Sequence, residues 1–135
     1  MPTDEHILGF SNQWYKPAIQ AADTILVAGR KVRLVTPVYF VATKLAAFHG
    51  RGESDLPLSQ DLEDIIIVVD GRPELVVEIK NSATDVRTYI VIEARQLLSR
   101  RDFSDAVSGF LLPDAASQDR RSIVEARLLE ISRLI

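Results

Sequence analysis

Cysteine is absent from the sequence, and histidine occurs only twice, as His6 and His49. Without thiols the chain can form no disulfide and offers no thiolate ligand, and two histidines do not suffice for a histidine-built metal site. No apolar run approaches the roughly 20 residues that a membrane-spanning helix needs. The opening Met-Pro-Thr-Asp-Glu has neither the basic nor the apolar segment of a secretory signal, so we expect a cytoplasmic protein that makes no membrane contact.

A large excess of charge of one sign is also missing. The 135 residues include 16 Lys and Arg and 19 Asp and Glu, which gives a formal net charge of −3 at pH 7. This balance argues against a general binder of polyanions. The arginine pairs at 100–101 and 120–121 carry no interleaved aromatic residues. The sequence therefore contains no recognisable nucleic-acid-binding motif, and nucleic acid stays an open question as a partner. Apolar residues make up 47% of the chain, and we expect one domain over residues 1–135 with a buried core.

Several segments carry the signals of amphipathic helices. A proline at the first helical position and a glycine after the last one predict a helix from Pro37 to Gly50. Ser59 as the cap, acidic residues in the first turns and apolar residues at i, i+3, i+4 and i+7 predict a second helix that ends at Gly71. Similar signals predict helices over residues 17–22, 84–99, 103–110 and from 115 onward, with Pro17 as the first residue of the earliest one.

Residues 23–27 and 31–36 have the β-branched and apolar content of strands. Gly29 lies between them and tolerates a positive φ, which predicts a type II′ hairpin turn with this glycine at the first central position. In the second strand Val32 and Leu34 alternate with basic residues, and this alternation predicts one buried and one solvent-facing side.

The expected fold is α+β and mostly helical, with one β-hairpin over about residues 23–36 that packs with five to six helices. A lone two-stranded hairpin is only marginally stable in water. Either helices cover it, or another chain supplies strands, or a part of the sheet is missing. Exposed strand edges favour pairing with another chain, so a helical module for protein interaction or dimerisation is one functional class that the sequence predicts.

Four charged residues form the first candidate site. Lys44 lies in an otherwise apolar helix and either extends its charge to solvent or directs it at an anion. Arg51 follows a glycine in an expected loop, where a guanidinium can contact a phosphate. Asp61 and Asp64 are three residues apart and share one helix face. The alternative is structural: the aspartates complement the helix dipole, and Lys44 pairs with one of them.

A second candidate combines Asp70 with Glu78 and Lys80. In metal-dependent nucleases a similar pattern holds Mg²⁺ through the two carboxylates, while the lysine orients the attacking water. This chemistry requires both apolar runs, residues 65–69 and 75–79, to be strands. The helix signals around Ser59 favour the competing interpretation of a solvated helix.

The remaining polar residues predict no further active site. His49 precedes Gly50 near the end of a predicted helix, where a histidine commonly interacts with the last carbonyl groups. Ser11, Ser59 and Ser104 have no neighbouring base, so a hydrolase triad has no support. Gly-Arg-Gly at 50–52 is followed by no Lys-Ser or Lys-Thr, so it is not a P-loop.

A resemblance to a known family rests on two stretches of the chain. Residues 35–52, VTPVYFVATKLAAFHGRG, and 59–66, SQDLEDII, resemble bacterial nucleotidyltransferase-like proteins of the abortive-infection toxin (AbiEii/AbiGii-like) family. The family motif has a lysine in "KL-A", then an arginine loop, then "D-L-x-D". Lys44, Arg51, Asp61 and Asp64 match it residue by residue. The resemblance implies that the two basic residues contact nucleotide phosphates, that the aspartates orient them or complete the site, and that residues 60–80 are helical.

The chain departs from the family pattern at the metal site. Members of the superfamily have a Gly-Ser or Gly-Gly turn and then Asp-x-Asp, whose carboxylates hold Mg²⁺, upstream of this region. This sequence contains none of these motifs. The resemblance therefore implies a partial nucleotidyltransferase-like fold, the C-terminal part of such a protein, which is catalytically inactive alone. No cofactor is expected unless a missing N-terminal part supplies Mg²⁺ with a nucleoside triphosphate. The expected partner is a second copy or an antitoxin-like protein.

Overall fold

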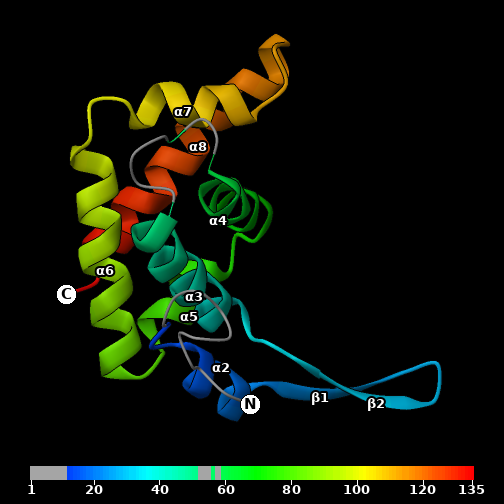
Figure 1. Cartoon of the computed structure of the whole chain (residues 1–135). Helices are drawn as coiled ribbons and strands as arrows, with labels where there is room; N and C mark the ends of the chain where they lie inside the picture. The colour runs from blue at the N-terminus through cyan, green and yellow to red at the C-terminus, as the bar shows by residue number, and fades with distance from the viewer. Residues whose placement is uncertain (1–11, 52–55, 57–58) are drawn as a thin grey trace.

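The fold is α+β and mostly helical. A computed structural model describes residues 12–51, 56 and 59–135, and within these residues it contains seven helices and one two-stranded antiparallel sheet (Figure 1). None of the described helices is both long and apolar enough to cross a bilayer. The elements are α2 (Tyr15–Ala21), β1 (Asp23–Val27), β2 (Arg30–Leu34), α3 (Pro37–Arg51), α4 (Gln60–Gly71), α5 (Leu75–Lys80), α6 (Thr84–Ser99), α7 (Phe103–Phe110) and α8 (Ala115–Ser132).

The capping residues position the helices close to where the sequence predicts them. The Ser59 hydroxyl accepts a hydrogen bond from the Leu62 N–H at 3.1 Å, which satisfies a backbone donor at the start of α4. Asp114 caps α8 in the same way by accepting from the Ser117 N–H at 2.8 Å. The predictions for α4 and α8 are therefore confirmed at their N-terminal ends.

Two helix boundaries differ from the prediction. Helix α2 begins at Tyr15, so Pro17 is its third residue; the first four N–H groups of a helix have no intrahelical acceptor, so a proline is tolerated there too. Helix α3 continues through Gly50 and ends at Arg51, so the expected loop does not include this arginine. Residues 52–54 of that loop lie outside the described residues.

Helices α3, α4, α6 and α8 lie together (Figure 1), and their apolar stripes meet in one core. This confirms the helical periodicity of the sequence, because residues three and four apart fall on the same face. Ile135 continues the spacing of this stripe four residues after Ile131 but is 52% exposed, because it lies beyond the end of α8. The buried stripe residues are Val41, Leu45, Phe48, Leu62, Ile65, Ile66, Val69, Val86, Ile90, Ala94, Leu97, Val124, Leu128 and Ile131.

The hairpin extends away from the helices as an arm, defined here as residues 23–34 (Figure 1). All ten strand residues are exposed. The predicted buried side of the second strand is therefore wrong: Val32 and Leu34 are 40% and 54% exposed. Alternation places side chains of one kind on one face, but burial also requires an element that covers this face, and no described helix does so.

The turn of the arm is of type I′, not type II′ as predicted. Ala28 and Gly29 are its two central residues, with φ of 51° and 79°. A positive φ at both central positions defines type I′, so Gly29 is the second central residue, and β2 begins at Arg30.

Candidate functional site

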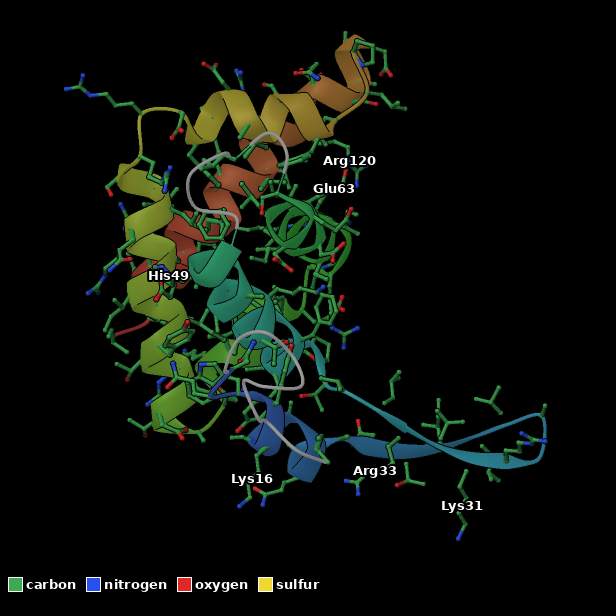
Figure 2. The ribbon with its side chains drawn as sticks, viewed as in Figure 1. Lys16, Lys31, Arg33, His49, Glu63 and Arg120 are labelled. Atoms are coloured by element: carbon green, nitrogen blue, oxygen red, sulfur yellow. The ribbon has the colours of Figure 1, made fainter. Side chains whose placement is uncertain are left out.

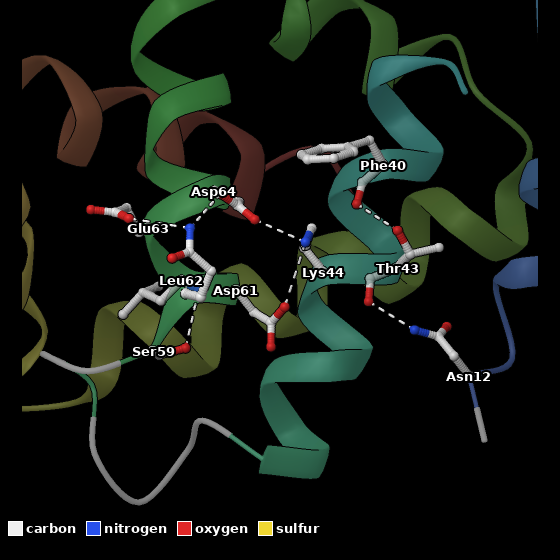
Figure 3. Close-up of polar contacts among 10 residues, drawn as sticks. Asn12, Phe40, Thr43, Lys44, Ser59, Asp61, Leu62, Glu63 and Asp64 are labelled. Atoms are coloured by element: carbon white, nitrogen blue, oxygen red, sulfur yellow. Dashed lines mark hydrogen bonds and ion pairs between the residues drawn. The ribbon is translucent and has the colours of Figure 1, made fainter. Parts of the chain in front are cut away.

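Lys44 connects helices α3 and α4 through two carboxylates. Its Nζ lies 2.8 Å from Oδ2 of Asp64 and 3.7 Å from Oδ1 of Asp61 (Figure 3). The Asp61 side chain is only 4% exposed, whereas Lys44 and Asp64 keep 26% and 23% of their side chains in contact with solvent. The structure thus brings together three of the four residues in the first candidate site, and we call these three the lysine cluster.

Local structure fixes each member of the lysine cluster. The cap at Ser59 sets the first turn of α4, so Asp61 and Asp64 project from the same side of this helix, three residues apart. Lys44 lies in the middle of α3, and its Nζ is 5.5 Å from the ring centroid of Phe40, one turn earlier. At this distance the ring quadrupole attracts the ammonium, which keeps the lysine side chain against its own helix.

The electrostatics of the cluster favour the charged state of Asp64. Partial burial acts to raise the pKa of this carboxyl, but hydrogen bonds from Lys44 and Gln60 outweigh it, so the pKa lies below its ordinary value. The Gln60 amide donates to Asp64 Oδ1 at 3.0 Å and also to Glu63 Oε1 at 3.2 Å. Asp64 therefore remains an anion at neutral pH and holds the ammonium of Lys44.

The geometry allows the cluster to do more than join two helices. Lys44 contacts both aspartates, at 2.8 Å from Asp64 and 3.7 Å from Asp61. An ammonium has three N–H donors, and two carboxylates leave one for another acceptor. With a quarter of its side chain exposed, Lys44 can contact the oxygen of an anion such as phosphate while the carboxylates fix its position.

Arg51, the fourth residue of this candidate site, is the last residue of α3. Its backbone is helical, so the predicted position in a loop is wrong. The predicted phosphate contact concerns a side chain that lies outside the described part of the structure, and it stays a prediction.

The strands that the nuclease hypothesis requires do not form. Residues 65–69 lie in α4 and residues 75–79 lie in α5. The physical reason is the spacing of the apolar residues, which follows the helical period, together with the cap at Ser59. Asp70, Glu78 and Lys80 consequently do not meet at the edge of a sheet.

The two acids of that hypothesis are held by arginines instead. Asp70 lies 2.7 Å from Nε of Arg120, and Glu78 accepts from Arg72 through both oxygens, at 2.7 and 2.8 Å. The hydrogen bonds from Arg72 keep the pKa of Glu78 below its ordinary value. Among the residues that the structure describes, no group of three or more histidine, aspartate and glutamate side chains could hold a metal ion.

A histidine and a glutamate form a second polar contact, which sequence analysis did not predict. His49 Nε2 lies 2.5 Å from Oε2 of Glu93, so the end of α3 is joined to the middle of α6 (Figure 2). The Glu93 side chain is only 12% exposed. The pair lies in an open depression of about 580 Å³, together with Tyr89 and the amides of Gln13 and Gln96. Burial, with a smaller contribution from the Glu93 charge, raises the pKa of Tyr89 to about 12.

One signal in the sequence could have identified this contact. Glu93 lies one position before Ala94 and three after Ile90, within the buried side of α6. A carboxylate among apolar positions requires a polar partner, because burying an unpaired charge is costly. Sequence alone does not identify His49 as this partner, since the contact depends on how α3 packs against α6.

No protein-family model, curated protein or solved structure matches the chain. The resemblance to AbiEii-like nucleotidyltransferases therefore stays a prediction.

Proposed function

We propose that the chain is a nucleotidyltransferase-like protein in which Lys44 contacts the phosphates of a nucleotide. One observation supports this proposal above all. Lys44, Asp61 and Asp64, which the family motif combines, lie on two different helices and meet in a single cluster. Helices α3 and α4 pack against each other, and this packing places the ammonium of Lys44 against both carboxylates.

The role of each residue follows from its contacts. Asp61 and Asp64 hold the ammonium of Lys44 in place, so the lysine loses little side-chain freedom when a phosphate binds. The partly exposed ammonium then donates to a phosphate oxygen, in the way that lysines act as point charges for phosphates. Arg51, by the same resemblance, is the second phosphate-contacting group.

The chain alone has no sequence motif for holding catalytic metal ions. The sequence contains no Asp-x-Asp. The two aspartates of the lysine cluster are already paired with an ammonium and do not fit a divalent-cation site. We propose nucleotide binding without transfer. A Mg²⁺-dependent transfer activity of this polypeptide that Asp61→Ala abolishes would contradict this part.

The binding proposal is tested by isothermal titration calorimetry with a nucleoside triphosphate. We expect Lys44→Met, which keeps the length of the side chain and removes its charge, to weaken binding at least tenfold, because a charge-assisted contact is lost. Lys16→Met is the matched control, since Lys16 is an exposed lysine on α2. This variant should bind the nucleoside triphosphate with the same affinity as the native chain. Equal affinities of native chain and Lys44→Met, with both folded by circular dichroism, would contradict the proposal.

The arm supports a second candidate function, a protein-interaction module. Its ten strand residues are all exposed, and one side of the arm carries Ile25, Val27 and Val32, which are 39%, 50% and 40% exposed. A contiguous apolar surface of this kind is typical of a site for another polypeptide. The arm is thus a docking element and not a part of the core.

If the arm serves interaction, the helices should fold without it. We expect that replacing residues 24–33 by a short glycine linker lowers the melting temperature by less than about 4 °C, because the arm places no side chain in the core. Thermal unfolding followed by circular dichroism at 222 nm measures this. Loss of the cooperative transition would show that the arm is needed for folding and would remove the second candidate.

A further inference from the structure

We propose that the free edge of β1 pairs with β1 of a second copy of this chain and forms a continuous four-stranded sheet. This inference rests on the second candidate function and adds to it the identity of the partner. It is independent of nucleotide binding at Lys44.

The strand register gives the arm two different faces. Paired residues share a face, and successive pairs alternate, so Ile25 with Val32 and Val27 with Arg30 lie on the same side as Leu34. Four aliphatic side chains therefore line this side, and all are exposed by 39% or more. Lys31 and Arg33 project from the other side (Figure 2). Two strands with an exposed apolar face are marginal in water, and further strands stabilise such a face.

The two edges of the arm differ in charge. Strand β2 carries Arg30, Lys31 and Arg33, whereas β1, with the sequence DTILV, carries one aspartate and no cation. Basic residues on an edge strand are a common protection against pairing with another strand. Arg33 is also engaged at the base of the arm, where its Nη2 donates to the Ile19 carbonyl at 2.7 Å. The unprotected edge is β1.

The turn type determines which backbone groups of β1 are free. In a type I′ hairpin Val27 and Arg30 form the first hydrogen-bonded pair, so Ile25 also directs its N–H and C=O toward β2. Thr24 and Leu26 then direct theirs toward the free edge. Two copies satisfy all of these groups when the symmetry axis passes at Ile25, because Thr24 of each copy then pairs with Leu26 of the other.

In this register no two residues of like charge face each other across the paired β1 strands. Ile25 faces Ile25 of the second copy, and Asp23 faces Val27. The same arrangement of two β2 edges would centre on Val32 and place Lys31 opposite Arg33 twice, which is destabilising. The arm points away from the helices, so the two helical bodies lie at opposite ends of the shared sheet (Figure 1).

Cysteine crosslinking tests the register, since the native chain contains no cysteine. At the axis the two copies of residue 25 form a non-hydrogen-bonded pair, whose Cα atoms are about 4.5 Å apart and can be joined by a disulfide. We expect Ile25→Cys to form a crosslinked dimer under mild oxidation. Val32→Cys is the matched control: it is the cross-strand partner of Ile25, on the same face and equally exposed, but about three strand spacings from its counterpart. Equal crosslinking of both variants, or none with Ile25→Cys, would overturn the inference.

A backbone variant provides a second test without cysteine. Leu26→Pro removes an N–H that points to the free edge and leaves the β1–β2 hydrogen bonds intact, as proline is tolerated on such edges. In sedimentation equilibrium the native chain should dimerise, Leu26→Ala should retain the dimer, and Leu26→Pro should weaken it at least tenfold. A native chain that stays monomeric at 100 μM, or a dimer that Leu26→Pro leaves unchanged, would refute the inference. In that case, an arm that remains dispensable for folding would still support docking of a different polypeptide.

Discussion

At the scale of single residues, the lysine cluster shows which contacts can be predicted from the pattern of charged residues. Asp61 and Asp64 were predicted to share a helix face, and Lys44 was predicted to direct its charge at an anion or to pair with an aspartate. The shared face of Asp61 and Asp64 follows from helical spacing, and the packing of α3 on α4 brings Lys44 into contact with both aspartates. The Glu93 contact with His49 was missed, because it depends on packing between helices and not on spacing within one.

The pH dependence of stability provides a residue-scale test of the cluster. Since the pKa of Asp64 is lowered in the folded chain, this carboxylate stabilises the fold above its ordinary pKa of 3.8 and loses that contribution as the pH falls through the lowered value. We expect the native chain to be more stable than Asp64→Asn at pH 7, and this difference to shrink below pH 3.8. Urea unfolding at several pH values measures the difference. A difference that stays constant into the acid range would contradict the assigned role of Lys44.

At the scale of elements, helices were predicted better than the hairpin. The helices depend on caps and on apolar periodicity, which are local, and Ser59 and Asp114 act as caps in the structure. The positions of the two strands were also predicted, but the type of the turn between them and the exposure of their side chains were not. The predicted turn type was wrong because the turn places Ala28 at a positive φ, a conformation that alanine adopts only at an energetic cost.

This cost gives a prediction for the turn. Asparagine tolerates a positive φ better than alanine, and Asn-Gly is the preferred pair of a type I′ turn. We expect Ala28→Asn to stabilise the arm by about 1 kcal/mol, seen as roughly fivefold slower amide hydrogen exchange within residues 23–34. Exchange in the helices should not change.

Gly29→Ala is the opposing variant for this experiment. Nothing lies within 4 Å of an added Cβ at this position, so any effect comes from the backbone at φ of 79°. Its arm amides should exchange faster than those of the native chain. Slower exchange in this variant would contradict the type I′ turn.

At the scale of the whole molecule, the fold separates a helical body from an exposed arm (Figure 1). The core follows from sequence, because four amphipathic helices bury their stripes against one another. The position of the arm does not, since alternation in a strand does not reveal whether anything covers it. The phosphate contact belongs to the body and the pairing edge to the arm, so the two functions can be tested separately.

The most direct test of nucleotide binding is an NMR titration of the ¹⁵N-labelled chain with a nucleoside triphosphate. We predict that the largest chemical-shift changes occur in residues 40–48 of α3 and 60–64 of α4, around Lys44, and that the amides of residues 23–34 do not shift. Absence of saturable changes at millimolar nucleotide, or changes that Lys44→Met leaves unaltered, would contradict the account.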